Sequence, residues 1–150
     1  MRIKTATSED LEILTPLFDG YRVFYKRESD VTGAKEFLKD RLEKKDSVIF
    51  VAVKKNGNGL GFTQLYPSFS SVAMQRVYIL NDLFVSLEAR GKGIGEKLLE
   101  HAKNFVIAEK CRGLTLETAI DNPAQKLYER LGWVLDREVF HYTWEIDKSI

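Results

Sequence analysis

A glycine-rich hexapeptide, Arg-Gly-Lys-Gly-Ile-Gly at residues 90–95, is the feature that most constrains this chain. Residues 77–85 before it are mostly apolar and β-prone, and apolar residues recur after it at steps of three and four from Ile94 to Phe105. This order predicts a strand, a tight loop and an amphipathic helix. Glycines leave main-chain N–H groups uncovered, and the start of a helix adds free N–H groups and a partial positive charge. The sequence therefore predicts a binding site for a phosphate or diphosphate group.

Two common nucleotide-binding motifs do not fit the hexapeptide. A P-loop requires Ser or Thr directly after its Gly-Lys pair, whereas Gly93 follows Lys92 here. A dinucleotide-binding G-x-G-x-x-G motif would place its third glycine one residue later than Gly95. The loop therefore indicates a phosphate-bearing ligand of another kind, and a glycine turn that binds no ligand is the alternative.

The composition argues against several classes of function. The length of 150 residues predicts a single domain over residues 1–150. The 23 basic and 22 acidic residues leave a formal net charge of +1, which gives no reason to expect a nucleic acid or membrane partner. The single cysteine, Cys111, cannot form an internal disulfide, which fits a reducing compartment. The first residues also lack the apolar core of a secretion signal. We therefore expect a cytoplasmic protein. His101, expected on the outer side of a helix, and His141 belong to no metal-spaced cluster, so no metal is expected.

The remaining pattern predicts a mixed α/β fold. Strands are expected at residues 3–6, 47–53, 61–66, 76–85 and 114–118, with one or two more between Trp133 and Ile146. Helices are expected after a cap at Thr7 or Ser8, from about Ala34, from Ile94, and from Asn122 to Gly132. This order places antiparallel hairpins first and a β-α-β crossover in the middle.

A second motif, Asn-Pro-Ala-Gln-Lys-Leu-Tyr-Glu-Arg-Leu-Gly-Trp, occupies residues 122–133. Helical spacing places Ala124, Leu127, Tyr128 and Leu131 on one inward face. Taken alone, this segment indicates a core helix in which Tyr128 only packs. Taken together, Arg-x-x-Gly-x-Gly after a strand and Asn-x-x-Ala-x-x-Leu-Tyr-x-x-x-Gly-Trp resemble the GNAT superfamily of acetyl-CoA-dependent N-acetyltransferases. The first half is also similar to the branch that contains histone and polyamine acetyltransferases.

This resemblance implies a fold and a co-substrate. It implies a mostly antiparallel central sheet that is splayed between two middle strands, with helices on both faces. It also implies that acetyl-CoA binds at the splay, with its diphosphate on the glycine loop. The residues expected to contact acetyl-CoA are Leu83, Phe84, Val85, Arg90, Gly91, Lys92, Gly93, Ile94, Gly95 and Asn122.

The resemblance further implies a reaction, the transfer of an acetyl group to a primary amine by direct attack in a ternary complex. Tyr128 is expected to protonate the departing sulfur. Glu117 and Asp82 are the candidate bases that accept a proton from the amine; a surface carboxylate and a bulge anchor are the respective alternatives. Main-chain N–H groups near Phe84 or Val85 are expected to stabilise the oxyanion.

The acceptor is expected to be a small molecule, an amino acid, a polyamine or a peptide. Its cationic amine would be flanked by aromatic rings, although these rings could equally fill the core; they are Tyr21, Tyr25, Tyr66 and Phe69. A homodimer is expected through late aromatic residues, which are Trp133, Phe140, Tyr142 and Trp144. A non-catalytic acyl-CoA-binding sensor and an enzyme for longer acyl groups are the alternative functions. An acetyl-Cys111 intermediate is disfavoured because no histidine is paired with this cysteine.

Overall fold

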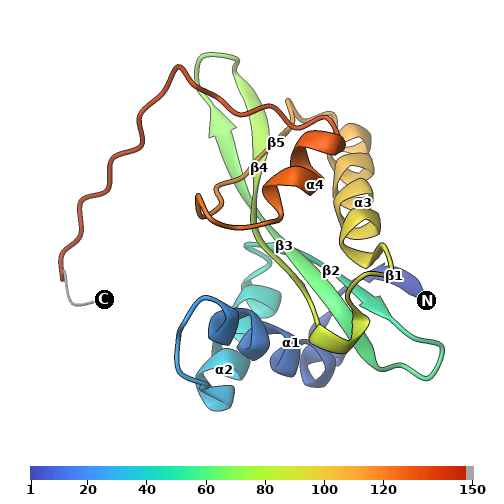
Figure 1. The fold of residues 1–150 in the computed structure, drawn as a ribbon. Coiled ribbons are helices and arrows are strands. Elements are labelled where there is room, and N and C mark those ends of the chain that lie inside the picture. Colours follow the sequence, from blue (N-terminus) through green and yellow to red (C-terminus); the bar gives the residue numbers. More distant parts are fainter. Residues whose placement is uncertain (148–150) are drawn as a thin grey trace. The chain divides into compact units, whose positions relative to one another are not determined.

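The computed structural model describes residues 1–147 and divides the chain into two compact units. The first unit, Met1–Glu117, contains a five-stranded sheet with the order β1-β2-β3-β4-β5 (Figure 1). Its strands are β1 (Arg2–Thr5), β2 (Val48–Val53), β3 (Gly59–Ser70), β4 (Gln75–Val85) and β5 (Leu114–Thr115). Neighbouring strands from β1 to β4 are antiparallel, and β5 is parallel to β4. This mixed sheet confirms the predicted fold class.

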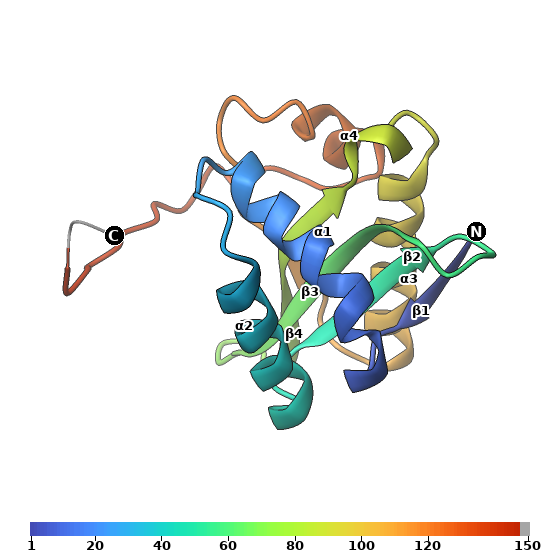
Figure 2. The same cartoon turned by 90° about the horizontal axis from the view of Figure 1, so that it is seen from below.

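Helices cover both faces of the sheet in this unit (Figure 2). Helices α1 (Leu11–Phe24) and α2 (Val31–Lys44) lie on one face, where the Phe18 ring packs 6.1 Å from the Phe62 ring. Helix α3 (Ile94–Ala108) lies on the other face, where the Phe105 ring packs 5.4 Å from the Phe50 ring. The His101 ring also lies 4.6 Å from Phe50, so the expectation that it faces outward is wrong.

Polar side chains fix the starts of the first two helices. Thr7 forms a capping box with Asp10 over the short 3-10 helix η1 (Ser8–Asp10) that leads into α1, as predicted. Helix α2 begins at Val31, three residues before the predicted start, because the Asp30 carboxylate accepts a hydrogen bond from Gly33 N at 2.9 Å. The Asp30 side chain therefore sets the start of the helix.

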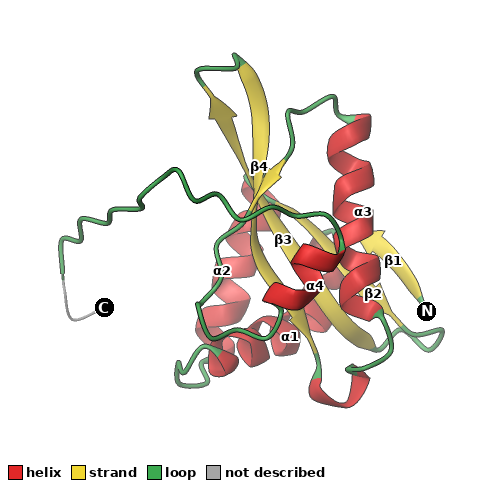
Figure 3. Ribbon diagram, turned by 45° about the horizontal axis from the view of Figure 1, so that its top comes forward, coloured by secondary structure: helices red, strands yellow, loops and turns green. Residues whose placement is uncertain are grey.

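Strand β3 is longer than the sequence predicts. It continues through Pro67 to Ser70 and forms a long hairpin with β4, so the loop expected at residues 68–71 is displaced toward the tip (Figure 3). Proline has no N–H group to donate to a neighbouring strand. Pro67 is tolerated because β2 begins only at Val48, which lies opposite Leu65, so beyond Leu65 strand β3 pairs with β4 alone.

The second compact unit begins at Thr118 and contains helix α4 (Gln125–Arg130). The helix begins after Pro123, later than predicted, and its last residue is Arg130. Gly132 closes it two residues later, where Gly132 N donates to Glu129 O and Trp133 N to Tyr128 O. Residues 133–147 contain no helix or strand, so the strands expected between Trp133 and Ile146 are absent from the described structure. An alternating apolar pattern forms a strand only where a neighbour pairs with it, and Phe140 is 89% exposed. Within residues 1–147, no helix combines the length and the apolar character that crossing a membrane requires.

Candidate functional site

A bulge interrupts β4 where it passes β3. Gln64 lies opposite Asp82, but the next pair along the strands is Leu65 with Leu80, so Asn81 is an extra residue without a partner position. A bulge of this kind changes which residues turn their main-chain groups toward each neighbour. Before the bulge, Tyr78 N donates to Gly113 O on the β5 side. After it, Ser86 N donates to Leu60 O on the β3 side.

Beyond the bulge, main-chain groups on one side of β4 have no strand partner among the described residues. Because these groups alternate along a strand, the Ser86 bond to β3 turns the N–H and C=O groups of Leu83 and Val85 the other way. On that side, β5 pairs with only Tyr78 and Ile79 of β4 in the described structure, and it is shorter than the predicted strand at residues 114–118. The first unit thus has an open strand edge at Leu83 and Val85.

Phe84 contributes differently to this edge. Its main chain pairs with β3, opposite Phe62. Its side chain packs against α1, where a Cβ atom added to Gly20 would lie 3.1 Å from the Phe84 ring. The close approach of α1 at Gly20 therefore holds the Phe84 ring against this part of the sheet.

The glycine loop follows directly from β4 through the short 3-10 helix η2 (Leu87–Ala89). Gly91 and Gly93 have φ angles of +77° and +78°, a conformation that side chains disfavour, and no atom lies within 4 Å of the position of an added Cβ. Gly93 is the N-cap of α3, so no side chain covers the N–H groups of the first turn. Ala89 and Ile94 are buried and anchor the two ends of the loop. This exposed ring of main-chain donors fits a diphosphate.

Arg90 fastens the loop to the end of β4. Its Nε donates to Val85 O at 2.9 Å. Its guanidinium lies 5.5 Å from the ring centres of both Phe24 and Phe84. The Arg90 side chain is thus engaged by the protein itself, whereas the adjacent glycines present main-chain groups to solvent.

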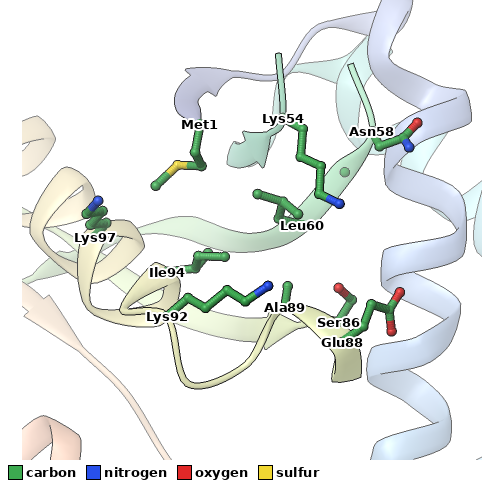
Figure 4. Close-up of a pocket in the computed structure, with 11 residues that line it drawn as sticks. Met1, Lys54, Asn58, Leu60, Ser86, Glu88, Ala89, Lys92, Ile94 and Lys97 are labelled. Carbon is green, nitrogen blue, oxygen red and sulfur yellow. The ribbon is translucent and has the colours of Figure 1, made fainter. Parts of the chain in front are cut away.

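A cavity of about 450 Å³ lies beside the loop, next to the β2–β3 hairpin (Figure 4). Leu60, Ala89 and Ile94 contribute apolar walls, and three lysines line it, which are Lys54, Lys92 and Lys97. The sequence did not predict this cavity, although Lys92 and Ile94 are among the expected acetyl-CoA contacts. None of the residues on the open strand edge lines it.

Asp82 is a buried carboxylate at the bulge, with 2% of its surface exposed. Its Oδ2 accepts a hydrogen bond from Gln64 Nε2 at 2.5 Å, and its Oδ1 accepts one from Asn81 Nδ2 at 2.7 Å. Burial raises the pKa of Asp82 above its usual range and outweighs the hydrogen bonds from Asn81 and Gln64, which lower it. Asp82 therefore binds a proton more readily than a surface aspartate does.

Three of the four predicted aromatic residues belong to this part of the first unit. The Tyr21 hydroxyl donates to Asn81 O at 3.2 Å, and the Tyr25 ring lies 5.0 Å from the Tyr21 ring. Burial, and then the negative charge of Asp82, raises the pKa of Tyr21. The same two causes raise the pKa of Tyr66 to about 12. Tyr21 and Tyr66 thus lie within the electrostatic reach of the Asp82 carboxylate.

Phe69 does not belong to this group. It lies five residues beyond Gln64 on β3, which corresponds to about 17 Å at the usual rise of a strand. It is 69% exposed, and the guanidinium of Arg76 covers its ring at 4.7 Å. The structure therefore does not bring Phe69 beside Tyr21, and its role in acceptor binding stays a prediction.

Glu117 differs from Asp82 in its exposure and in its position relative to the sheet. It is exposed, and it lies two residues beyond the end of β5, so the prediction that it stands on a strand is wrong. The Asp82 carboxylate, in contrast, is buried and held by two side-chain amides. The role of base stays a prediction for both residues.

The second unit holds the two remaining predicted residues. The side-chain oxygen Oδ1 of Asn122 accepts a hydrogen bond from Ala124 N at 2.9 Å, just before α4. Tyr128 is buried, and its ring lies 6.0 Å from the Trp133 ring. The roles expected for both residues stay predictions.

Sequence reasoning missed Gln64 and Ser47. Gln64 is fully buried, and its Oε1 accepts a hydrogen bond from Ser47 Oγ at 2.9 Å. The sequence did contain one indication of a buried amide, because Gln64 lies within the mostly apolar segment at residues 60–65. Only the register of β3 against β4 shows that this amide faces Asp82.

The chain is similar to known acetyltransferases over most of its length. Residues 13–133 match the acetyltransferase (GNAT) family. The chain is 49% identical over 143 residues to YhfO, an uncharacterized N-acetyltransferase of Bacillus subtilis (strain 168), and the match covers 95% of each protein. It is 31% identical over 141 residues to a "probable acetyltransferase" of Haemophilus influenzae, covering 86% of this chain and 97% of that protein.

A solved structure agrees with these relatives. The crystal structure of a "probable acetyltransferase" matches with a TM-score of 0.92 and 44% sequence identity, covering 98% of this chain and 99% of the other. The glycine loop and the open edge of β4 lie inside the matched residues. This chain therefore belongs to the GNAT family of acetyltransferases.

Proposed function

We propose that this enzyme transfers the acetyl group of acetyl-CoA to a primary amine of a small molecule, an amino acid, a polyamine or a peptide. The amine attacks the thioester directly while both substrates are bound. The observation that supports this proposal is the layout of β4, whose open edge runs from a bulge with a buried carboxylate to a glycine loop with uncovered N–H groups.

The open edge and the loop suit the two polar parts of acetyl-CoA. An extended chain that contains amides can pair with the main-chain N–H and C=O groups of Leu83 as an added strand does. The diphosphate suits the N–H groups of residues 91–95, where no side chain stands in the way. Because Arg90 engages Val85 O, the Val85 N–H is the group left as a donor, and we assign it to the oxyanion.

Asp82 is the base in this proposal. An alkylamine has a pKa of about 10.4 in water, so it must lose a proton before it attacks. The raised pKa of Asp82 makes its carboxylate a better proton acceptor than an ordinary aspartate. Because only 2% of Asp82 is exposed, the proton would reach it through an intervening water molecule. Tyr128 supplies the proton to the departing thiolate.

The acceptor site in this proposal uses the tyrosines around Asp82. A protonated amine is attracted by the carboxylate and by aromatic faces. Tyr21 and Tyr25 form such an aromatic pair, and the charge of Asp82 acts on Tyr66 as well. We therefore expect cationic amines to be better acceptors than amines that carry a carboxylate close by.

The test measures release of free CoA thiol with a panel of acceptors. The panel contains simple alkylamines, amino acids, a polyamine and a lysine-containing peptide, each with acetyl-CoA and with propionyl-CoA. We expect at least one amine to accelerate thiol release above hydrolysis and to yield an acetylated product by mass spectrometry. CoA binding in calorimetry without release for any amine would indicate a sensor instead of an enzyme. Absence of heat on titration with CoA would overturn the binding site itself.

A further inference from the structure

Gln64 is an unusual residue for the middle of a sheet. Its side chain is fully buried between neighbours on β3 that are mostly apolar. A buried amide is unfavourable unless its donors and acceptors are matched. Both ends of the Gln64 amide have partners, which are Ser47 at the oxygen and Asp82 at the nitrogen.

Ser47 determines which end of the Gln64 amide faces Asp82. Its hydroxyl donates to Gln64 Oε1 at 2.9 Å, so the amide oxygen points away from the bulge. The amide nitrogen then donates to Asp82 Oδ2 at 2.5 Å. The opposite orientation would bring two oxygen acceptors together, which is repulsive when the carboxylate is ionised.

The groups that stabilise the ionised form of Asp82 are uncharged hydrogen-bond donors. From α1 it faces the hydroxyl of Tyr21, and from β3 it faces Tyr66, whose pKa also responds to Arg41 of α2 and to Asp46. In residues 1–147, Asp82 forms no ion pair. The amides of Gln64 and Asn81 are therefore the main groups that stabilise the ionised form of the Asp82 carboxylate and fix its orientation.

We propose that Gln64 is a positioning residue of the reaction, which holds the Asp82 carboxylate at the β4 bulge through an amide oriented by Ser47. This inference rests on the proposed function, in which Asp82 accepts the proton of the amine. Gln64 itself does not touch either substrate. Gln64 affects the reaction by changing the pKa and the orientation of the Asp82 carboxylate.

Gln64→Met tests this role, with Thr63→Val as the matched control. Methionine has a similar volume but cannot donate to Asp82. Thr63 is the adjacent, equally buried residue of β3, and its hydroxyl donates to the main-chain oxygen of Asp82 at 2.8 Å instead of to the carboxylate. Thr63→Val loses one side-chain hydrogen bond, and Gln64→Met loses two, the one from Ser47 and the one to Asp82. Only Gln64→Met loses a bond to the reacting group.

Two readouts separate the inference from the proposed function. The pKa of the Asp82 carboxyl is followed by NMR in the full chain, which requires no activity. The acidic limb of the pH profile of kcat/KM is measured for the best amine. In Gln64→Met we expect both to move upward by about one pH unit, because the carboxylate loses a charge-assisted hydrogen bond. In Thr63→Val we expect neither to move.

Other outcomes overturn the inference. An unchanged Asp82 pKa in Gln64→Met would show that the amide only fills space. A shifted pKa without a shift in the kinetic limb would show that Asp82 is not the base, so Gln64 would have no role in the reaction. If Gln64→Met does not fold, Ser47→Ala serves in its place, and a smaller upward shift of the same pKa is expected. An unshifted pKa in Ser47→Ala would then overturn the inference.

Discussion

The β4 bulge lies within strand β4, and the glycine loop follows the end of the same strand. The bulge uses side chains, whereas the loop uses main-chain groups. The loop presents main-chain N–H groups, and Gly91 and Gly93 serve it by having no side chains. The bulge presents a side chain, and Asp82 is held there by amides from Gln64 and Asn81. In the proposed mechanism, main-chain groups of the loop bind the co-substrate, and the buried carboxylate at the bulge takes part in the reaction.

The two regions should respond to mutation in opposite ways. Removing a side chain from the loop leaves its main-chain donors in place, whereas adding a Cβ there strains a left-handed conformation. At the bulge, a change of one polar atom leaves its partners unpaired in a buried place, which is costly. The glycine loop should therefore be sensitive to added side-chain atoms, and the bulge to changes in hydrogen-bonding groups.

The largest effect is expected from Asp82→Asn. Asparagine keeps the shape of the side chain but cannot accept the proton, so we expect kcat to fall by about 100-fold or more. The exposed Glu117 is the control, because Glu117→Gln should change kcat by no more than about twofold. The measurement is steady-state thiol release with the best acceptor. A larger loss in Glu117→Gln than in Asp82→Asn would exchange the two assignments and break the comparison.

Tyr128→Phe extends the comparison to the second unit. If Tyr128 protonates the departing sulfur, we expect kcat to fall by about 10- to 1000-fold, with little change in CoA affinity. The measurements are turnover with the true acceptor and calorimetric titration with CoA. Wild-type turnover in this variant would remove Tyr128 from the mechanism and confine the proton transfers to the first unit.

The sequence predicted the parts of this site that depend on local order. The hexapeptide at residues 90–95 and the apolar spacing after it were enough to predict the loop and α3, because glycine conformation and helix periodicity are properties of neighbouring residues. The cap at Thr7 and the closing of α4 by the turn at Gly132 were predicted for the same reason. The family followed from two motifs read together.

Features that depend on distant partners were not predictable. The role of Gln64 depends on a register that a bulge at Asn81 shifts by one residue, and no local pattern encodes that shift. Pro67 suggested the end of a strand, but its effect depends on where β2 begins. The segment after Trp133 has the alternation of a strand, and whether it pairs depends on a neighbour that its own residues do not supply.

A smaller effect is expected in the glycine loop from Gly93→Val. A β-branched residue at a φ of +78° costs about 1–2 kcal/mol, so we expect the Kd for CoA to rise by about tenfold. Lys92→Ala is the control, with a change of about twofold or less, because the loop binds through its main chain. Both Kd values are measured by calorimetry. A larger loss in Lys92→Ala than in Gly93→Val would show that the loop binds through side-chain charge and would break the comparison.

The smallest effect is expected on stability, where two buried aspartates should respond to pH in opposite directions. Burial raises the pKa of Asp82 above 3.8, so the folded protein binds its proton more tightly than the unfolded chain and loses stability as pH rises through the folded pKa. Burial also opposes ionisation of Asp10, but the bond to Lys4 at 2.6 Å and the hydrogen bonds from Thr7 outweigh it and lower the pKa. Asp10 therefore contributes stability above 3.8 that is lost as pH falls through its folded pKa.

The free energies of unfolding of the wild type, Asp82→Asn and Asp10→Asn, measured in urea from acid to neutral pH, test this contrast. Relative to Asp82→Asn, the wild type should gain stability as pH falls, because the buried carboxyl becomes neutral. Relative to Asp10→Asn, it should lose stability as pH falls, because the pair with Lys4 is broken by protonation. Slopes of the same sign for the two variants would mean that the amides at the bulge stabilise the Asp82 charge as fully as Lys4 stabilises that of Asp10. Asp82 would then be an ordinary carboxylate, and the advantage assigned to it as a proton acceptor would disappear.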